Sequence, residues 1–335
     1  MKSFSIKSFM APLAGLSVCI LIIITCGNKP TESISLLFTG TFTSKYYFGL
    51  MLNTASMLMI SGSGALIAIK GGNMNLGGEG QIYAGGLIAG LILSSNMGVH
   101  PVIQFTIALI LSLLIGSFLT GFSAVLKELR GTEVLLTSFL LSAAIIPLAD
   151  GLITSINGKT DQNLIALPYI KDCFKMPRIL SPSPLTPVIF LALSFCILAF
   201  LIYTRTFAGR KTIIWGKAPL FAKYSGYSSK LNTASTLCIS GALHSLTGFL
   251  SVAGTYYTCH QGFYSGMGWN ALSVALIASG NPISLIPSAL VLAWIYTSAD
   301  RVGLTQGFNF DISGIVQSCI LFSIAIPFIK RRKEK

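Results

Sequence analysis

The chain has 335 residues, of which 53% are hydrophobic and 10% are charged, and its mean hydropathy is +0.74. Soluble domains carry about 25% charged residues, so this composition excludes a soluble globular protein and places most side chains against lipid or one another. The net charge of +13 does not indicate nucleic-acid binding, because the basic residues are concentrated in a few short segments between apolar stretches.

Stretches without Asp, Glu, Lys or Arg predict membrane-spanning helices, each of which needs roughly 20 apolar residues. They cover residues 10–28, 46–69, 80–126, 179–204 and 231–299. The longest of them must contain two or three spans each. We predict an all-α polytopic transmembrane helical bundle, a single transmembrane domain over residues 1–335, with spans at 9–27, 48–69, 82–96, 102–126, 134–153, 187–204, 231–250, 268–279, 282–298 and 313–329.

The N-terminal segment is similar to a lipoprotein signal, with Lys2 and Lys7 before an apolar run that leads to Cys26. However, Thr25 stands where such a signal has a small residue, and more hydrophobic segments follow. We therefore interpret residues 9–27 as a retained first helix.

The distribution of basic residues predicts the orientation of the spans. Basic residues cluster in the N-terminal segment, in 127–133, in 204–230 and in the C-terminal segment, and such clusters face the cytoplasm in multi-pass proteins. Both termini are therefore expected to be cytoplasmic. The segments expected to face outward are 28–47, 154–186, which forms an external loop, and 299–312.

A glycine-rich strip, GGNMNLGGEGQ at 71–81, separates two apolar stretches and contains four polar side chains, Asn73, Asn75, Glu79 and Gln81. Glycines alone would indicate close helix packing. A carboxylate at membrane depth is costly and instead indicates a cavity, a partner or the interface. Two interpretations of Glu79 remain open: an interfacial position near Lys70, or a place on a translocation path.

The chain also contains an internal similarity. NTASMLMISG at 53–62 and NTASTLCISG at 232–241 agree at eight of ten positions, and the predicted topology gives them opposite directions. A glycine-rich segment follows each copy, and the second is QGFYSGMGW at 261–269. The pattern favours an inverted-topology repeat over a chance similarity, and it predicts short or broken helices around a path that includes Trp269 and Asn270.

No arrangement of residues indicates an enzyme. The sequence has no Ser/His/Asp triad and no metal-ligand spacing, and Gly158-Lys159-Thr160 is only a partial match to a nucleotide-binding GxxxxGK[ST] loop. Glu79 and the isolated His244 do not form the chain of ionisable groups that ion-driven carriers use. We expect no catalytic residue, no metal and no bound cofactor, with an ion-coupled secondary carrier as the alternative class. A disulfide between Cys173 and Cys259 remains open.

The largest predicted cytoplasmic loop, 204–230, carries six basic residues and no acidic residue. Its middle predicts a short amphipathic helix that begins near Pro219. We interpret this segment as the coupling element for a cytosolic ATPase, formed by Lys217, Ala218, Pro219, Leu220, Phe221 and Lys223.

Several segments resemble permease subunits of bacterial ABC importers, in the branch for nucleosides and simple sugars, with riboflavin importers as close relatives. The similarity rests on MNLGGEGQ at 74–81, TEVLLTSF at 132–139, GKAPLFAKYSGY at 216–227, ISGALHSLTG at 239–248 and GWNALSVALIASGNP at 268–282. It covers roughly residues 45–330. One departure is Leu220, which replaces a glutamate of the family's loop and weakens any assignment of an acidic ATPase contact there.

The resemblance implies a permease of the bacterial cytoplasmic membrane that imports a nucleoside or a similar heterocycle such as riboflavin, with simple sugars as the alternative. It also implies cytosolic ATPase subunits that use the ATP, a second permease subunit in a heterodimer, and an extracytoplasmic solute-binding lipoprotein. The stretch 31–47 resembles the nucleoside-type subunit.

Overall fold

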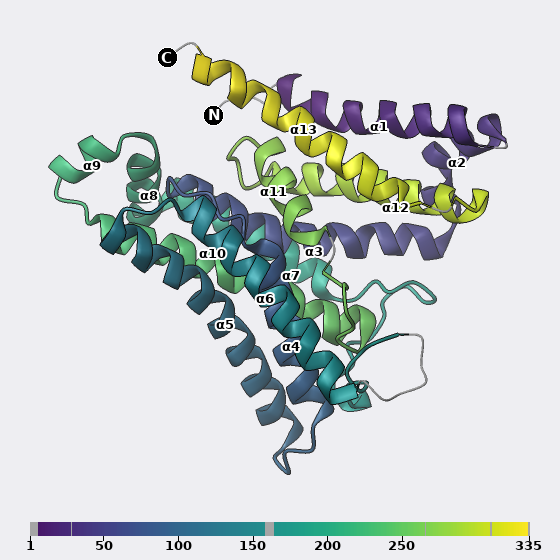
Figure 1. Ribbon diagram of the computed structural model, residues 1–335, viewed down its shortest axis with the longest axis horizontal. Coiled ribbons are helices and arrows are strands. Elements are labelled where there is room, and N and C mark those ends of the chain that lie inside the picture. Colours follow the sequence, from purple (N-terminus) through teal and green to yellow (C-terminus); the bar gives the residue numbers. More distant parts are fainter. Residues whose placement is uncertain (1–5, 28, 158–163, 265, 309, 334–335) are drawn as a thin grey trace.

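The computed structural model describes residues 6–27, 29–157, 164–264, 266–308 and 310–333 (Figure 1). Within these ranges the chain is helical, and an isolated β-bridge pairs Ala166 with His260. Lys2 and the Gly158-Lys159-Thr160 segment lie outside the described residues, as do the last two residues of the basic C-terminal segment.

The elements follow one another with short connections. In chain order they are α1 (Ile6–Cys26), α2 (Pro30–Thr43), α3 (Lys45–Lys70), α4 (Gly78–Ser94), α5 (Pro101–Arg130), α6 (Val134–Asn157), the 3₁₀ turn η1 (Asp172–Phe174), α7 (Val188–Arg205), α8 (Phe207–Lys217), α9 (Pro219–Tyr224), α10 (Ser229–Ser251), the π-helical turn η2 (Val252–Tyr256), α11 (Met267–Ile277), α12 (Leu285–Gln306) and α13 (Ile312–Lys333).

Local sequence explains where several helices begin and end. Pro101 occupies the first turn of α5, and Gly131 ends that helix in the left-handed conformation, which costs glycine little. Gly307 ends α12 in the same way. Thr206 begins α8 because its hydroxyl accepts a hydrogen bond from the backbone N–H of Gly209.

The two helices that carry the internal similarity form the centre of the bundle. In their most apolar windows, α3 is 78% buried and α10 with η2 is 83% buried, whereas the windows of α5, α6 and α7 are at most 28% buried. All five are long and apolar enough to cross a membrane. The exposed apolar faces of the outer three therefore suit contact with lipid, while α3 and α10 face protein.

Small residues allow α10 to approach its neighbours almost backbone to backbone. Gly248 lies against the carbonyl oxygen of Ile82 in α4, and Gly241 lies against Gly116 in α5. The hydroxyl of Ser245 donates to the carbonyl of Gln81 at 2.7 Å. Close approach of this kind replaces the hydrophobic effect as the main source of helix association inside a membrane.

The helices α3 and α10 contact each other reciprocally. Asn53, near the start of α3, donates to the Thr255 hydroxyl beyond α10 at 3.0 Å, and Asn232, near the start of α10, donates to the carbonyl of Gly71 beyond α3 at 3.0 Å. Each asparagine is the first residue of its copy of the repeated segment. This reciprocal pairing at opposite ends is the arrangement that an inverted-topology repeat predicts.

Several boundaries differ from those that hydropathy predicts. The outward segment 28–47 contains α2, which packs on α12 through Ser33, Leu37 and Thr41, and the Thr41 and Ser298 hydroxyls lie 2.6 Å apart. Helix α12 ends at Gln306, whereas the predicted span ends at residue 298. Residues 299–306 of the predicted outward segment 299–312 are therefore helical. These segments are too polar to be identified as helical from hydropathy, and contacts with other helices stabilise them.

The peripheral helices complete the shape. α1 and α13 pack side by side along the upper edge of the view, and α8 and α9 project at its left, the side toward which the C-terminal end of α13 points (Figure 1). The projecting pair confirms a short helix from Pro219 to Tyr224, as the loop sequence indicates. The sequence did not predict α8, which precedes it.

We expect Gly248→Leu to destabilise the folded protein by about 1–3 kcal/mol or more, because a side chain there would displace the α4 backbone at Ile82. Thermal unfolding in detergent, followed by gel filtration, measures the effect. Gly151→Leu in α6 is the matched control, since an added Cβ at Gly151 meets no atom within 4 Å. Equal thermal stability of the two variants would contradict this account of α10 packing.

Candidate functional site

The N-terminal ends of the two short helices α4 and α11 meet inside the bundle. A Cβ placed on Gly78 would lie 3.1 Å from the Cα of Gly268, and one placed on Gly268 would collide with the backbone N of Glu79. Glycine is therefore needed on both sides of the contact. Helix N-termini carry partial positive charge, so this junction favours a negative group between them.

Glu79 supplies that negative group. It lies in the first turn of α4, and its Oε1 accepts a hydrogen bond from the backbone N–H of Gly266, the N-cap residue of α11, at 2.9 Å. The side chain of Trp269 interacts with the same carboxylate. Lys70, the alternative partner that the sequence indicates, instead lies over the Tyr203 ring at 4.8 Å.

The amides of the glycine-rich strip are paired with one another. Asn75 Nδ2 donates to Gln81 Oε1 at 2.9 Å, and Gln81 Nε2 donates to Asn75 Oδ1 at 3.1 Å. Asn75 also donates to the Ser240 hydroxyl at 3.0 Å. Both amides are buried. These hydrogen bonds hold the strip against α10. Few donors or acceptors of the two amides remain available to a solute.

The strip continues toward the predicted cytoplasmic side through Asn73, whose Oδ1 accepts from Lys127 Nζ at 2.5 Å. Nearby, Gly72 lies against Gly216 at the end of α8, and Gly216 in turn lies against the carbonyl oxygen of Lys70. The loop that contains α8 and α9 is therefore in direct backbone contact with the end of α3 and the start of the strip.

His244 lies beside the junction and is buried. Its Nδ1 is 2.5 Å from the Ser61 hydroxyl, and its Nε2 has no hydrogen-bond partner in the described part of the chain. A single bond to a neighbouring helix fits the packing role that an isolated helical histidine favours.

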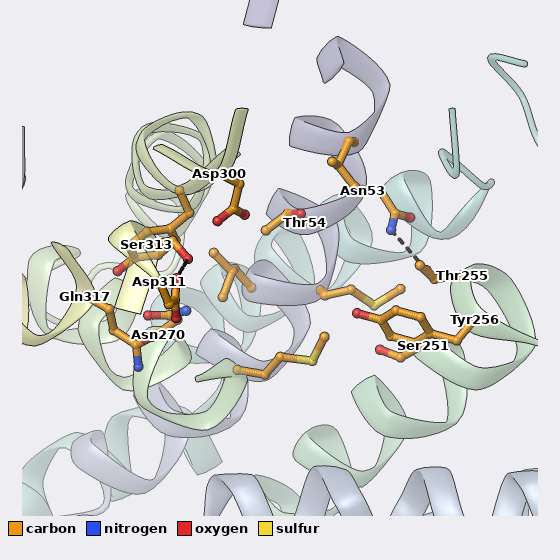
Figure 2. Close-up of a pocket in the computed structure, with 15 residues that line it drawn as sticks. Asn53, Thr54, Ser251, Thr255, Tyr256, Asn270, Asp300, Asp311, Ser313 and Gln317 are labelled. Carbon is orange, nitrogen blue, oxygen red and sulfur yellow. Dashed lines mark hydrogen bonds between the residues drawn. The ribbon is translucent and has the colours of Figure 1, made fainter. Parts of the chain in front are cut away.

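A polar cavity of about 230 Å³ lies next to the junction, between α3, the end of α10, η2, α11, α12 and α13. Figure 2 shows Asp300, Asp311, Ser313, Asn270 and Gln317 on one side and Asn53, Ser251, Thr255 and Tyr256 on the other. The cavity opens beside the exposed residues Asp300 and Asp311, and Asn53 and Ser251 are buried. Of the residues that the sequence predicts for a path, Asn270 lines this cavity.

The two aspartates of the cavity were missed by sequence reasoning. Asp311 precedes α13, and its Oδ1 accepts hydrogen bonds from the Ser313 hydroxyl at 2.8 Å and from the backbone N–H of Gly314 at 3.0 Å. Asp300 belongs to the last part of α12. Both fall in 299–312, which we had interpreted only as an outward connection, although two acids in so weakly charged a chain were a usable signal.

Helix α9 has the form of a docking element. Pro219 is its first residue, and Ala218 precedes it as the N-cap. Leu220, Phe221 and Tyr224 are 71%, 62% and 89% exposed, whereas Ala222 is fully buried against the rest of the loop. Lys217 and Lys223 flank this apolar surface at the ends of α8 and α9.

Metal and disulfide chemistry receive no support among the described residues. No group of three His, Cys, Asp or Glu side chains is placed to hold a metal ion. Cys173 is exposed and Cys259 is buried, and both are free thiols.

Comparison with known proteins gives a consistent assignment. The family described as the branched-chain amino acid transport system / permease component matches residues 46–325. The chain is 34% identical over 324 residues to the probable riboflavin import permease protein RfuC of Treponema pallidum, which covers 96% of this chain and 85% of that protein.

Two further relatives are more distant. The nucleoside ABC transporter permease protein NupB of Lactococcus lactis is 26% identical over 92% of this chain and 87% of its own length. The glucose ABC transporter permease protein TsgB13 of Haloferax volcanii is 22% identical over 95% of this chain and 87% of its own length. The chain therefore belongs to this family of ABC transporter permease components, as a multi-pass membrane subunit whose transport is driven by ATP hydrolysis on a partner ATPase.

Proposed function

We propose that the chain forms the translocation path of an importer for a nucleoside or a similar small heterocyclic solute, with riboflavin included. The observation that carries this proposal is a polar cavity beside two facing helix N-termini, inside a bundle whose outer helices are apolar. Polar, irregular backbone at membrane depth is tolerated where it lines a protein-walled cavity, and it is typical of solute sites in transporters.

The relatives support the choice of solute class. The relative with 34% identity is named for riboflavin and the one with 26% for nucleosides, whereas the one named for glucose is 22% identical. Riboflavin and nucleosides share a flat heterocycle joined to a hydroxylated chain or ring. A simple-sugar importer remains the second candidate on these similarities.

The proposed path begins at the cavity and continues past the junction. Solute would enter between Asp300 and Asp311, pass Asn270, and reach the space beside Glu79 and Trp269 as α4 and α11 separate. The paired amides of Asn75 and Gln81 hold the strip in place on this route. We assign Asn73 to the cytoplasmic end of the path, where it contacts Lys127.

Coupling to ATP is assigned to α9 and its flanking residues. The exposed surface of Leu220, Phe221 and Tyr224 suits insertion into a groove of the ATPase. Movement of α9 would reach the path through the backbone contact of Gly216 with Gly72 and Lys70. Rigid-body motion transmitted by packed elements is the ordinary means by which such an interface alternates access.

The assembly that follows from this function has four kinds of component. We propose cytosolic ATPase subunits, a second and unlike permease subunit, and an extracytoplasmic binding lipoprotein that delivers solute. The membrane is the bacterial cytoplasmic membrane, with both termini and the 204–230 loop on the cytoplasmic side. ATP is used by the partner, and this chain binds no cofactor.

Reconstitution separates this function from an ion-coupled carrier. We expect the purified chain alone in liposomes to take up no labelled riboflavin or adenosine under an imposed proton or sodium gradient, because Glu79 is held by Gly266 and Trp269 and no relay of acids crosses the described bundle. Uptake should require the ATPase and ATP inside the vesicles. Gradient-driven uptake by the chain alone would overturn the proposal.

The double variant Leu220→Asp/Phe221→Asp is expected to abolish solute uptake and solute-stimulated ATP hydrolysis in the reconstituted complex, while membrane insertion stays normal. Two charges on α9 oppose burial in an apolar groove. Leu304→Asp, which alters a residue that is 76% exposed at the end of α12, serves as the control and should transport normally. Wild-type uptake by the double variant would remove the coupling role of α9.

Replacement of Glu79 tests the junction. We expect Glu79→Ala to lower the uptake rate about tenfold, because the backbone N–H of Gly266 loses its acceptor and the two helix N-termini lose the negative charge between them. Glu79→Gln keeps an acceptor oxygen and should retain more uptake than the alanine variant. Initial rates in proteoliposomes give the comparison, and equal rates for all three proteins would rule out a role for the carboxylate.

A further inference from the structure

The lining of the polar cavity contains many hydrogen-bond acceptors and no cation. Asp300 and Asp311 are its charged residues, and no Lys, Arg or His contributes to the lining. Asp311 already accepts two hydrogen bonds at Oδ1, from Ser313 and from Gly314, which hold its carboxylate in place, whereas Oδ2 accepts none from the described residues. The electrostatics of the cavity therefore oppose anionic solutes and favour groups that donate hydrogen bonds.

The inner part of the cavity contains polar atoms that lack partners. Asn53 and Tyr296 are 3% and 6% exposed, and both line the cavity. The Oδ1 of Asn53 and the hydroxyl of Tyr296 have no hydrogen-bond partner in the described part of the chain, and neither does the Oδ1 of Asn270. Buried polar groups are nearly always satisfied, and each exception calls for an explanation such as a ligand.

The size of the cavity limits what can occupy it. Its volume of about 230 Å³ is below the roughly 300–1,000 Å³ of pockets that enclose drug-sized ligands. This space suits a sugar-sized group and is too small for a fused heterocycle together with its side chain. A bare metal ion would leave most of it empty. Met57, Leu58 and Met267 provide apolar surface for carbon-bound hydrogens.

We propose that this cavity is the subsite for the hydroxylated part of a neutral solute, with the carboxylates of Asp300 and Asp311 accepting hydrogen bonds from neighbouring hydroxyls. Asn53, Asn270 and Tyr296 complete the recognition from the inner end after a small shift of their side chains, because their unpaired polar atoms are each less than 1 Å² exposed. This assignment rests on the proposed function and deepens it, because it states which half of a nucleoside or riboflavin the permease recognises. The heterocycle then projects out of the cavity.

Equilibrium binding to the complex of the full-length permease with its second permease subunit and its ATPase tests the assignment. The binding lipoprotein is left out because it would impose its own solute selectivity. The probes are two matched pairs, riboflavin with lumiflavin, which has the same ring system and a methyl group in place of the hydroxylated chain, and adenosine with adenine. We expect the wild-type complex to bind the hydroxylated member of each pair at least about tenfold more tightly.

The variants Asp300→Asn and Asp311→Asn should lower riboflavin and adenosine affinity about tenfold and leave lumiflavin and adenine affinity unchanged, because they remove the charge from the acceptors of the hydroxyls. Thr54→Val, an isosteric change in the cavity lining, should reduce the same selectivity by less. Asp172→Asn is the control, since Asp172 is an exposed acid paired with Lys175 outside the cavity. Gel filtration checks that each complex is intact.

Three results would overturn the assignment. If the wild type and both aspartate variants had the same selectivity, the carboxylates would have no role in solute recognition. The proposed importer function would not be affected by that result. An equal loss of affinity for both members of each pair would indicate a general structural role instead of hydroxyl recognition. If the wild-type complex bound none of the four probes, the proposed solute class and the subsite would fail together.

Discussion

The structure depends on the close packing of α10 against its neighbours. A bilayer offers no water to drive helices together, so van der Waals contact and buried hydrogen bonds must hold the bundle. Gly248 against the backbone of α4 and Gly241 against Gly116 of α5 allow this contact. With α10 at the centre, α3 contacts it through hydrogen bonds at both ends of the pair. The polar residues of both helices then lie in the interior of the bundle.

The arrangement of the short helices follows from that centre. Because α3 ends at Lys70 and α4 begins only at Gly78, the strip between them has free backbone groups that must find partners inside protein. The Ser138 hydroxyl accepts from the backbone N–H of Leu76 at 3.0 Å, and the Ser142 hydroxyl accepts from that of Gly80 at 2.8 Å. These serines from α6 satisfy the strip, and Glu79 can then join the N-termini of α4 and α11.

The same geometry connects the site with the cytoplasmic loop. Gly216 contacts the strip at the level of Lys70 and Gly72, one residue before Lys217 and three before α9 begins. A force on the exposed face of α9 therefore acts close to the backbone that positions Asn73, Asn75 and Glu79. The polar cavity lies beyond the junction, lined by α11 residues such as Asn270 close to the N-terminus of that helix.

Sequence information was sufficient to assign the class of the protein and most of its helices. Hydropathy and charge are properties of short segments, so the uncharged stretches identified the long spans, and Pro219 within a basic loop identified α9. Hydropathy failed for α2 and for the end of α12, because their Thr, Ser and Arg residues are stabilised by contacts between helices: Arg301 donates to the carbonyl of Gly40.

The pairing of the polar groups, by contrast, became visible only in the packed bundle. The Glu79 carboxylate is paired with the backbone N–H of Gly266, 187 positions away in the sequence, and Asn75 donates hydrogen bonds to Gln81 and to Ser240. Asn53 of α3, Tyr296 and Asp300 of α12, and Asp311 before α13 line one cavity although they are far apart in the sequence. The rotation of each helix about its axis settles these pairings, and the close packing of neighbouring helices, not the local sequence, fixes that rotation.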